Sequence, residues 1–202
     1  MDLSADTILK LERYRELLVA WQDKINLVGR STLGDFWRRH ILDSGQLFPL
    51  LPDSGRGPLV LVDLGSGAGF PGLVLAILAS GAGRAIAVHL VESDQRKAAF
   101  LAEAARRTGV AATVRIHAAR IERLAPGTIP PADVVTARAL APLDRLLGLA
   151  APLLAPDGIC LFLKGAGVEG ELTAAAKTWK MRATRHASRS DPSGTVLKIE
   201  GL

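Results

Sequence analysis

The stretch that most constrains the fold of this chain is residues 59–72, LVLVDLGSGAGFPG. It opens with an apolar, β-branched run that ends at Asp63, and after the last glycine it continues as an apolar, alanine-rich run over residues 73–79. Between these runs lie four glycines: Gly65, Gly67, Gly69 and Gly72. A strand, a glycine-rich turn and a helix in this order are typical of a βαβ unit that binds a nucleotide or an adenosine. The glycines permit positive φ angles and let a ligand lie close to the main chain.

Two ligand classes compete for this loop. Residues 67–72 fit the spacing G-x-G-x-x-G, which alone suggests a dinucleotide. Residues 63–69 fit the acidic-x-Gly-x-Gly-x-Gly pattern of S-adenosylmethionine-dependent methyltransferases. Pro71 removes one N–H donor from a turn that would hold pyrophosphate, and Asp63 suits a ligand with a cationic amino group. The sequence therefore favours the methyl donor over the dinucleotide, and a glycine turn without a ligand is the third interpretation.

The size and charge of the chain indicate one globular domain with an anionic partner. Its 202 residues are enough to bury a sizeable core, and 49% apolar with 22% charged residues argues against disorder. The net charge of +5 favours nucleic acid as the partner. The alternative is positive charge dispersed over an arginine-rich surface.

The expected compartment is the cytoplasm. No apolar run reaches the roughly 18 residues of a membrane span, and the N-terminus lacks the pattern of a signal peptide. The single cysteine, Cys160, lies in an apolar, strand-like run, so we expect a buried thiol and no disulfide. Four histidines and no C-x-x-C motif give no metal-ligand spacing, so we expect no metal.

We expect the chain to divide into an N-terminal helical extension, residues 1–51, and a methyltransferase domain, residues 52–202, which together form one compact unit. Apolar residues at steps of three and four predict a first helix that begins near Ser4 and ends at Gly29. A second helix is expected over residues 33–50. The cluster of turn residues at 52–58 predicts the linker. We expect the extension to pack on the sheet and overhang the ligand site.

After the linker, apolar strand-like runs alternate with helical runs, which predicts an α/β fold with a mostly parallel sheet of seven strands covered on both faces. The five expected parallel strands cover residues 59–63, 85–91, 112–117, 133–137 and 158–163. The expected helices cover residues 71–79, 95–108, 142–154 and 169–177. Two weaker strands, 179–186 and 195–200, would form a final antiparallel hairpin.

Polar residues follow four of these strands at the edge where a doubly wound sheet binds ligands. Glu92 can accept two ribose hydroxyls, or it is a solvated residue beginning a helix. The Ile121 main chain could bond an adenine edge beside Glu122, or the pair simply starts a loop. Arg138 and Lys164 are costly to desolvate unless they are paired, and the possible partners are the carboxylate of the donor, a substrate phosphate, guanine O6 or an acidic side chain of the protein. His40 is a lone histidine on an expected helix, and such residues are more often packing or surface residues than functional ones.

Several stretches keep one order along nearly the whole chain: Trp21 with Asn26-Leu27, residues 39–44 (RHILDS), 63–72 (DLGSGAGFPG), Glu92-Ser93, 136–139 (TARA) and 163–165 (LKG). Together they resemble the bacterial small-subunit rRNA guanine-N7 methyltransferase family, once called glucose-inhibited division protein B. RHILDS and the complete glycine loop are the specific parts of this resemblance. The chain differs from the family's common residues at three positions: Glu92 in place of Asp, Val28 in place of Thr, and Leu140 in place of Phe.

The resemblance implies a class I, Rossmann-like methyltransferase fold with an N-terminal helical extension, and S-adenosylmethionine as the donor. The donor-binding residues expected from motif and resemblance are Asp63, Gly65, Gly67, Gly69, Phe70, Glu92, Ile121, Glu122 and Arg138. The implied target is a guanine N7 in 16S rRNA, free or in a small-subunit particle, and we expect a monomer. The expected RNA-binding residues are Arg38, Arg39, His40, Arg96, Lys97, Arg120 and Lys164.

Guanine N7 carries a lone pair and no proton, so the predicted reaction needs no general base, and the sequence offers none. We therefore expect no residue that acts as a general base. The expected role of the protein is to position the substrates, and Arg138 and Lys164 are the candidates for this role. Two alternatives remain at this stage. One is a methyltransferase that acts on a small molecule or a protein, and the other is a dinucleotide-dependent oxidoreductase.

Overall fold

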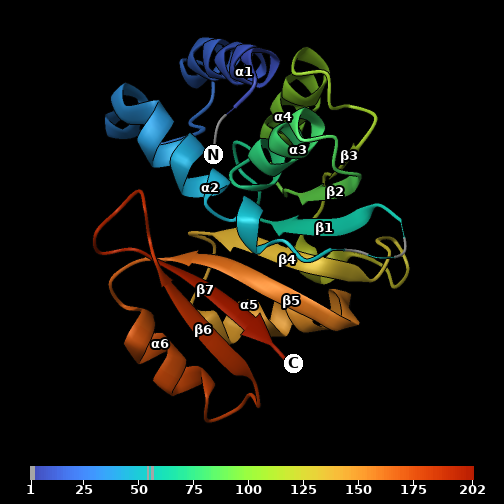
Figure 1. The fold of residues 1–202 in the computed structure, drawn as a ribbon, viewed down its shortest axis with the longest axis vertical. Coiled ribbons are helices and arrows are strands. Elements are labelled where there is room, and N and C mark those ends of the chain that lie inside the picture. The colour runs from blue at the N-terminus through green and yellow to red at the C-terminus, as the bar shows by residue number, and fades with distance from the viewer. Residues whose placement is uncertain (1–2, 54, 56) are drawn as a thin grey trace.

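A seven-stranded sheet forms the centre of the molecule in the computed structural model, which describes residues 3–53, 55 and 57–202 (Figure 1). The strand order is β3-β2-β1-β4-β5-β7-β6. The strands are β1 (Leu59–Leu64), β2 (Ile86–Val91), β3 (Val114–His117), β4 (Ala132–Arg138), β5 (Leu154–Lys164), β6 (Arg182–Ala187) and β7 (Thr195–Glu200). The first five are parallel, and β7 pairs antiparallel with both β5 and β6, which confirms the predicted sheet and its final hairpin. Ser54 and Arg56 of the predicted linker lie outside the described residues.

Helices cover both faces of the sheet (Figure 1). One side carries α1 (Ala5–Gln22), α3 (Gly72–Gly81) and α4 (Gln95–Arg107), and the other carries α5 (Leu143–Ala150) and α6 (Val168–Ala175). Each face of the sheet has its own hydrophobic core, the first under α1, α3 and α4 and the second under α5 and α6. Successive strand residues point to opposite faces, so that Leu61 lies in the first core and Val62 in the second. Strands that are buried on both faces read as continuous apolar runs, which is why the sequence marked them clearly.

Cys160 lies in the second core with no exposed surface, as predicted. Burial raises the pKa of its thiol to about 12, so the group is an unreactive packing residue. In the described part of the chain, no helix combines the length and the apolar character that a membrane crossing requires.

The first helix is shorter than predicted. It begins after Ser4, whose hydroxyl accepts a hydrogen bond from the Thr7 N–H at 3.2 Å, but α1 ends at Gln22 and not at Gly29. The Gln22 amide oxygen accepts from the N–H groups of Leu27 and Val28 at 3.0 and 3.1 Å, and its NH₂ donates to the Val28 carbonyl at 2.8 Å. A buried side-chain amide thus takes up the main-chain groups that a continued helix would have paired.

The predicted second helix, residues 33–50, is also wrong, because the segment is broken into short turns. A 3₁₀ helix (Arg30–Asp35), a π-helix (Trp37–Leu42), the short α2 (Asp43–Gly45) and a second 3₁₀ helix (Phe48–Leu50) follow one another. Phe36 and Ile41, five residues apart, are both buried, and this spacing fits the wider π turn. Packing has therefore overridden the α-helical period here.

The extension shares its core with the sheet. Leu11, Tyr14 and Leu18 of α1 are fully buried in the same cluster as residues of α3 and α4. The Tyr14 hydroxyl donates to the Ala68 carbonyl in the glycine loop, and its ring lies 5.3 Å from that of Phe70. Burial raises the pKa of the Tyr14 phenol well above its usual value, so the hydroxyl remains a hydrogen-bond donor. The extension thus supports the loop directly.

Candidate active site

The glycine loop turns through conformations that favour glycine. Gly65, Gly67 and Gly69 have φ angles of +63°, +57° and +94°. A Cβ on Gly65 would lie 2.6 Å from the Leu140 side chain, and one on Gly72 would lie 2.7 Å from the Asp63 Cβ. The predicted positive φ angles are confirmed at Gly65, Gly67 and Gly69. The groups that come close to Gly65 and Gly72 are protein side chains, and the approach of a ligand to this loop remains a prediction.

Asp63 lies behind the loop, with no exposed surface. Its Oδ1 accepts from the Thr136 hydroxyl at 2.8 Å and its Oδ2 from the Gly72 N–H at 3.2 Å. Burial raises the pKa of this carboxyl to about 6 despite those hydrogen bonds. The Asp63 carboxyl therefore links β1 to β4 and to the start of α3. Three of the predicted donor-binding residues, Asp63, Gly69 and Phe70, do not line either of the cavities described below.

A cavity of about 360 Å³, here called the edge cavity, lies at the carboxyl ends of β1 to β4. Parallel strands bring their ends together here, at the point where the chain order reverses between β1 and β4. The predicted residues that line it are Gly65, Gly67, Glu92, Lys97, Arg120, Ile121, Glu122 and Arg138. Six members of the predicted donor-binding set therefore share one wall, together with two of the predicted RNA-binding residues.

Glu92 is fixed at the rim of this cavity. One carboxylate oxygen accepts from the Gly67 N–H at 2.9 Å and the other from the Asp94 N–H at 2.8 Å. The side chain thus ties the end of β2 to the glycine loop. Each carboxylate oxygen keeps a further lone pair, so the group can still accept hydrogen bonds from a ligand.

Ile121 and Glu122 lie in a 3₁₀ helix (Ile121–Arg123) after β3. The Glu122 carboxylate pairs with Arg145 at 3.1 Å, and both side chains are more than half exposed. A hydrogen bond to its own main-chain N–H, followed by the bond to Arg145, lowers the pKa of Glu122. An exposed pair of this kind adds little to stability, so Glu122 remains available to a ligand.

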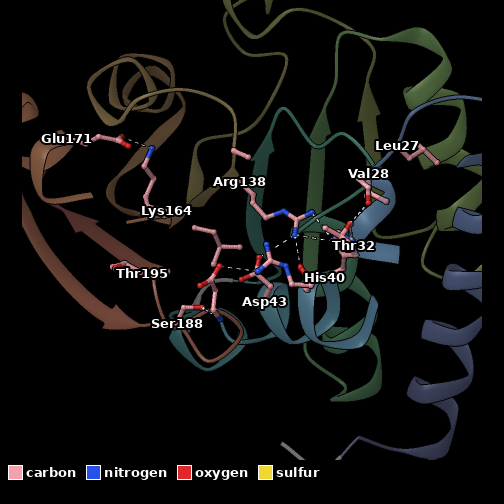
Figure 2. Close-up of a pocket in the computed structure, with 17 residues that line it drawn as sticks. Leu27, Val28, Thr32, His40, Asp43, Arg138, Lys164, Glu171, Ser188 and Thr195 are labelled. Atoms are coloured by element: carbon pink, nitrogen blue, oxygen red, sulfur yellow. Dashed lines mark hydrogen bonds and ion pairs between the residues drawn. The ribbon is translucent and has the colours of Figure 1, made fainter. Parts of the chain in front are cut away.

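A second cavity of about 420 Å³, here called the extension cavity, opens on the other side of Arg138 (Figure 2). Its walls come from residues 27–32 and 39–43 of the extension, the end of β5, α6, and the loop between β6 and β7. The two cavities share Arg138 and Ala139. Ala139 has a φ of +51° and is the only non-glycine residue with positive φ among those described.

Arg138 is held from several sides where the cavities meet (Figure 2). Its guanidinium donates to the Arg39 carbonyl at 3.1 Å and to the Asp43 carboxylate at 3.3 Å, and its Cζ lies 4.9 Å from the centre of the Phe70 ring. The side chains of Arg138 and Asp43 are 21% and 17% exposed. The structural ion pair that the sequence left open is therefore present, and it is supplied by the extension.

His40 is a buried neutral residue beside Arg138. Its Nδ1 lies 3.3 Å from the Arg138 guanidinium and its Nε2 lies 2.9 Å from the Thr32 hydroxyl. Burial, and then the charges of Arg138 and Arg39, lower the pKa of His40 to about 4. Because a guanidinium can only donate, Nδ1 accepts and the proton lies on Nε2. The structure gives His40 partners within the protein.

Most of the predicted RNA-binding cations have partners within the protein as well. Arg38 donates to the Ser190 carbonyl at 2.8 Å, and Arg39 pairs with Asp191 at 3.0 Å. Lys164 lies 2.6 Å from Glu171. Arg96 is exposed on α4 and 3.5 Å from Asp94. The predicted set is thus divided between the edge cavity, the extension cavity and the outer surface.

Sequence reasoning missed several residues of this site, among them Thr32, Asp43, Glu171 and Asp191. Asp43 had a signal, because it belongs to the RHILDS run at 39–44. Glu171 and Asp191 are joined to Lys164 and Arg39 by contacts between separate elements, and Thr32 is joined to His40, eight residues later, across the break between two short helices. Within the described residues, no three His, Cys, Asp or Glu side chains are grouped so as to hold a metal ion.

The chain is similar to known proteins over almost its whole length. A family model described as rRNA small subunit methyltransferase G matches residues 7–193. A protein of Paramagnetospirillum magneticum named ribosomal RNA small subunit methyltransferase G is 57% identical over 197 residues, which cover 98% of this chain and 90% of that protein. A protein of Rhodospirillum centenum with the same name is 56% identical and covers 99% of this chain and 87% of its own length.

Solved structures share the fold at low sequence identity. The O-methyltransferase TomG from Streptomyces achromogenes, in complex with S-adenosylmethionine, has a TM-score of 0.60 at 15% identity and covers 100% of this chain and 92% of its own. An O-methyltransferase from Bacillus cereus, in complex with S-adenosylhomocysteine, has a TM-score of 0.60 at 13% identity, with 94% and 91% coverage. The sheet order and these neighbours show the class I methyltransferase fold.

Proposed function

Because the chain belongs to the rRNA small subunit methyltransferase G family, we propose that it transfers the methyl group of S-adenosylmethionine to N7 of a guanine in 16S rRNA. The chain is a methyltransferase of ribosomal RNA, and its methyl donor is S-adenosylmethionine. The observation that carries the proposal is the meeting of two cavities at Arg138 and Ala139. Direct methyl transfer between two bound substrates needs this arrangement.

The edge cavity fits the donor in size and chemistry. Its volume of about 360 Å³ lies within the range of small-molecule sites. Glu92 offers free lone pairs to ribose hydroxyls, and Gly65 and Gly67 present main chain without side chains. Arg138 supplies a cation for the donor's carboxylate. When bound, S-adenosylmethionine supplies an electrophilic methyl group on a sulfonium sulfur.

The extension cavity is assigned to the guanine. The major groove of A-form RNA excludes side chains, so the target base must be unpaired or extruded to enter a protein cavity. Arg138, which lines this cavity as well, is a candidate to bond guanine O6, the acceptor beside N7. Asp43 pairs with Arg138 and reduces the local positive charge, which favours a reaction that leaves positive charge on the purine.

No residue has to remove a proton, since N7 has none. The contribution of the protein is to hold both substrates in line, and orientation of this kind can supply roughly 7–11 kcal/mol of the barrier. Arg39, Arg96, Lys97 and Arg120 are proposed to contact the RNA backbone. We further propose a monomer that works without a metal in the bacterial cytoplasm, on free 16S rRNA or a small-subunit particle.

One experiment tests the assignment at the level of the cell. The 7-methylguanosine map of 16S rRNA is compared between cells with the gene and cells that lack it. Loss of one 7-methylguanosine supports the proposal, and an unchanged map contradicts it. Binding of S-adenosylhomocysteine and NADH to the pure protein separates the remaining alternatives. Binding of NADH alone would favour the oxidoreductase, whereas binding of S-adenosylhomocysteine with an unchanged map would favour a different methyl acceptor.

A further inference from the structure

An ion pair on the wall of the extension cavity joins three elements of the fold (Figure 2). Lys164 ends β5, and its Nζ lies 2.6 Å from the Glu171 carboxylate of α6 and donates to the Ala141 carbonyl at 3.0 Å. The same Glu171 oxygen accepts from the Leu143 N–H at 2.6 Å. The Lys164 side chain is only 9% exposed. The two side chains therefore hold the main chain of residues 141–143 by hydrogen bonds at both of its ends.

The residues just before this segment lie where the two cavities meet. Ala139 lines both of them, and Leu140 and Ala141 line the edge cavity. The Leu140 side chain lies close over Gly65, where a Cβ would meet it at 2.6 Å. Ala139 has the unfavourable φ of +51°, and such a conformation persists only when its surroundings hold it.

The start of α5 depends on the same pair of side chains, Lys164 and Glu171. Pro142 precedes the helix and has no N–H, and no side chain of its own neighbourhood caps the first turn. Glu171, 28 residues further along the chain, accepts from the first available N–H, that of Leu143. Because charged hydrogen bonds are stronger than neutral ones, this contact fixes where the segment leaves β4 and enters α5.

We propose that Lys164 and Glu171 are positioning residues for the methyl donor, because together they hold residues 139–143 against the glycine loop. The inference rests on the proposed function, since it assigns the donor to the edge cavity. Neither side chain touches the reacting atoms. Lys164 acts through Ala141 and Glu171, and its role is structural support of the donor wall rather than contact with RNA phosphate.

The test measures S-adenosylhomocysteine binding by calorimetry without RNA, in the wild type and in the variants Lys164→Met and Glu171→Gln. Each variant is expected to raise the dissociation constant about five- to tenfold, and the double variant by less than the product of the two, because the residues act as a unit. Lys164→Arg keeps the charge and is expected to restore most of the affinity. Glu169→Gln is the matched control, because Glu169 lies in the same helix turn but pairs with Arg185 at the surface.

The binding measurements distinguish failure of the proposed function from failure of the positioning role. If the wild type does not bind S-adenosylhomocysteine, the proposed function fails. If the wild type binds it and the variants bind equally well, the positioning role is wrong, whether or not their melting temperatures fall. If Lys164→Met instead weakens RNA binding and reduces its salt dependence by about one counterion, Lys164 contacts a phosphate and the inference is overturned.

Discussion

The His40 imidazole lies flat on the Phe70 ring, with the ring centres 4.6 Å apart and the planes at 18°. Phe70 belongs to the glycine loop, and His40 belongs to the extension. The Arg138 guanidinium lies over the same phenyl ring, 4.9 Å from its centre. The extension thus holds the arginine that both cavities share.

His40 is expected to make stability depend on pH in a defined direction. Its folded pKa of about 4 lies below the usual 6.5, so between these values the unfolded chain binds a proton that the folded chain does not. The contribution to stability is complete above pH 6.5 and is lost as the pH falls towards 4. The wild type should therefore lose up to about 2 kcal/mol more than His40→Asn over this range. Denaturant unfolding at several pH values measures the difference, and parallel pH profiles would contradict it.

Gly65→Ala should cost more than its backbone conformation alone explains. Gly65 and Gly83 have nearly equal φ angles of +63° and +64°, but only at Gly65 would the new Cβ meet another side chain, that of Leu140 at 2.6 Å. Gly83→Ala is expected to cost about 1 kcal/mol of unfolding free energy. Gly65→Ala should cost about 1–3 kcal/mol more and weaken S-adenosylhomocysteine binding. Equal losses in the two variants would show that the Leu140 contact is unimportant.

Glu92→Gln should weaken donor binding strongly. The replacement puts an NH₂ group where a carboxylate oxygen now accepts from the N–H of Gly67 or Asp94, so two donors would face each other. We expect the dissociation constant of S-adenosylhomocysteine to rise at least about tenfold, as for loss of a charged hydrogen bond. Glu122→Gln in the same cavity is the control and should change it less, because Glu122 is exposed and its partner is Arg145. Calorimetry measures the dissociation constants of both variants. A larger increase for Glu122→Gln than for Glu92→Gln would contradict the role of Glu92 as the main acidic ligand of the donor.

Asp191→Asn should strengthen RNA binding by releasing Arg39 from its ion pair at 3.0 Å. The side chains of both residues are more than a third exposed, so the pair costs little to break and a phosphate can replace Asp191. Arg39→Ala should weaken binding and lower the salt dependence by about one counterion. Arg106→Ala, at the far end of α4, is the control. Filter binding at several salt concentrations measures all three, and no change in the slope for Arg39→Ala would remove its phosphate role.

The sheet was predictable because its signals are local. Strands buried on both faces give unbroken apolar runs, and parallel strands place their final residues at one edge. Glu92, Ile121 and Arg138 could therefore be assigned to one site from their positions after three strands. This reasoning needs only the order of the elements and no knowledge of their contacts.

The parts that sequence reasoning missed depend on contacts between distant residues. Asp43 and Arg138 are 95 residues apart, and neither sequence neighbourhood indicates the pair. The end of α1 depends on how the buried Gln22 amide is oriented, and the π turn at residues 37–42 depends on the packing of Phe36 and Ile41. A helical period describes one face of a helix, so it does not reveal where tertiary packing interrupts that helix.

The narrow partition formed by Arg138 and Ala139 has a consequence for the design of inhibitors. A compound that links an adenosine to a purine across this partition would occupy both cavities at once, and the linkage would raise the effective concentration of the second group. The adenosine half would suit many methyltransferases of this fold. Discrimination would come from the purine half, whose surroundings combine segments that precede the sheet with the end of β5, α6 and the loop between β6 and β7.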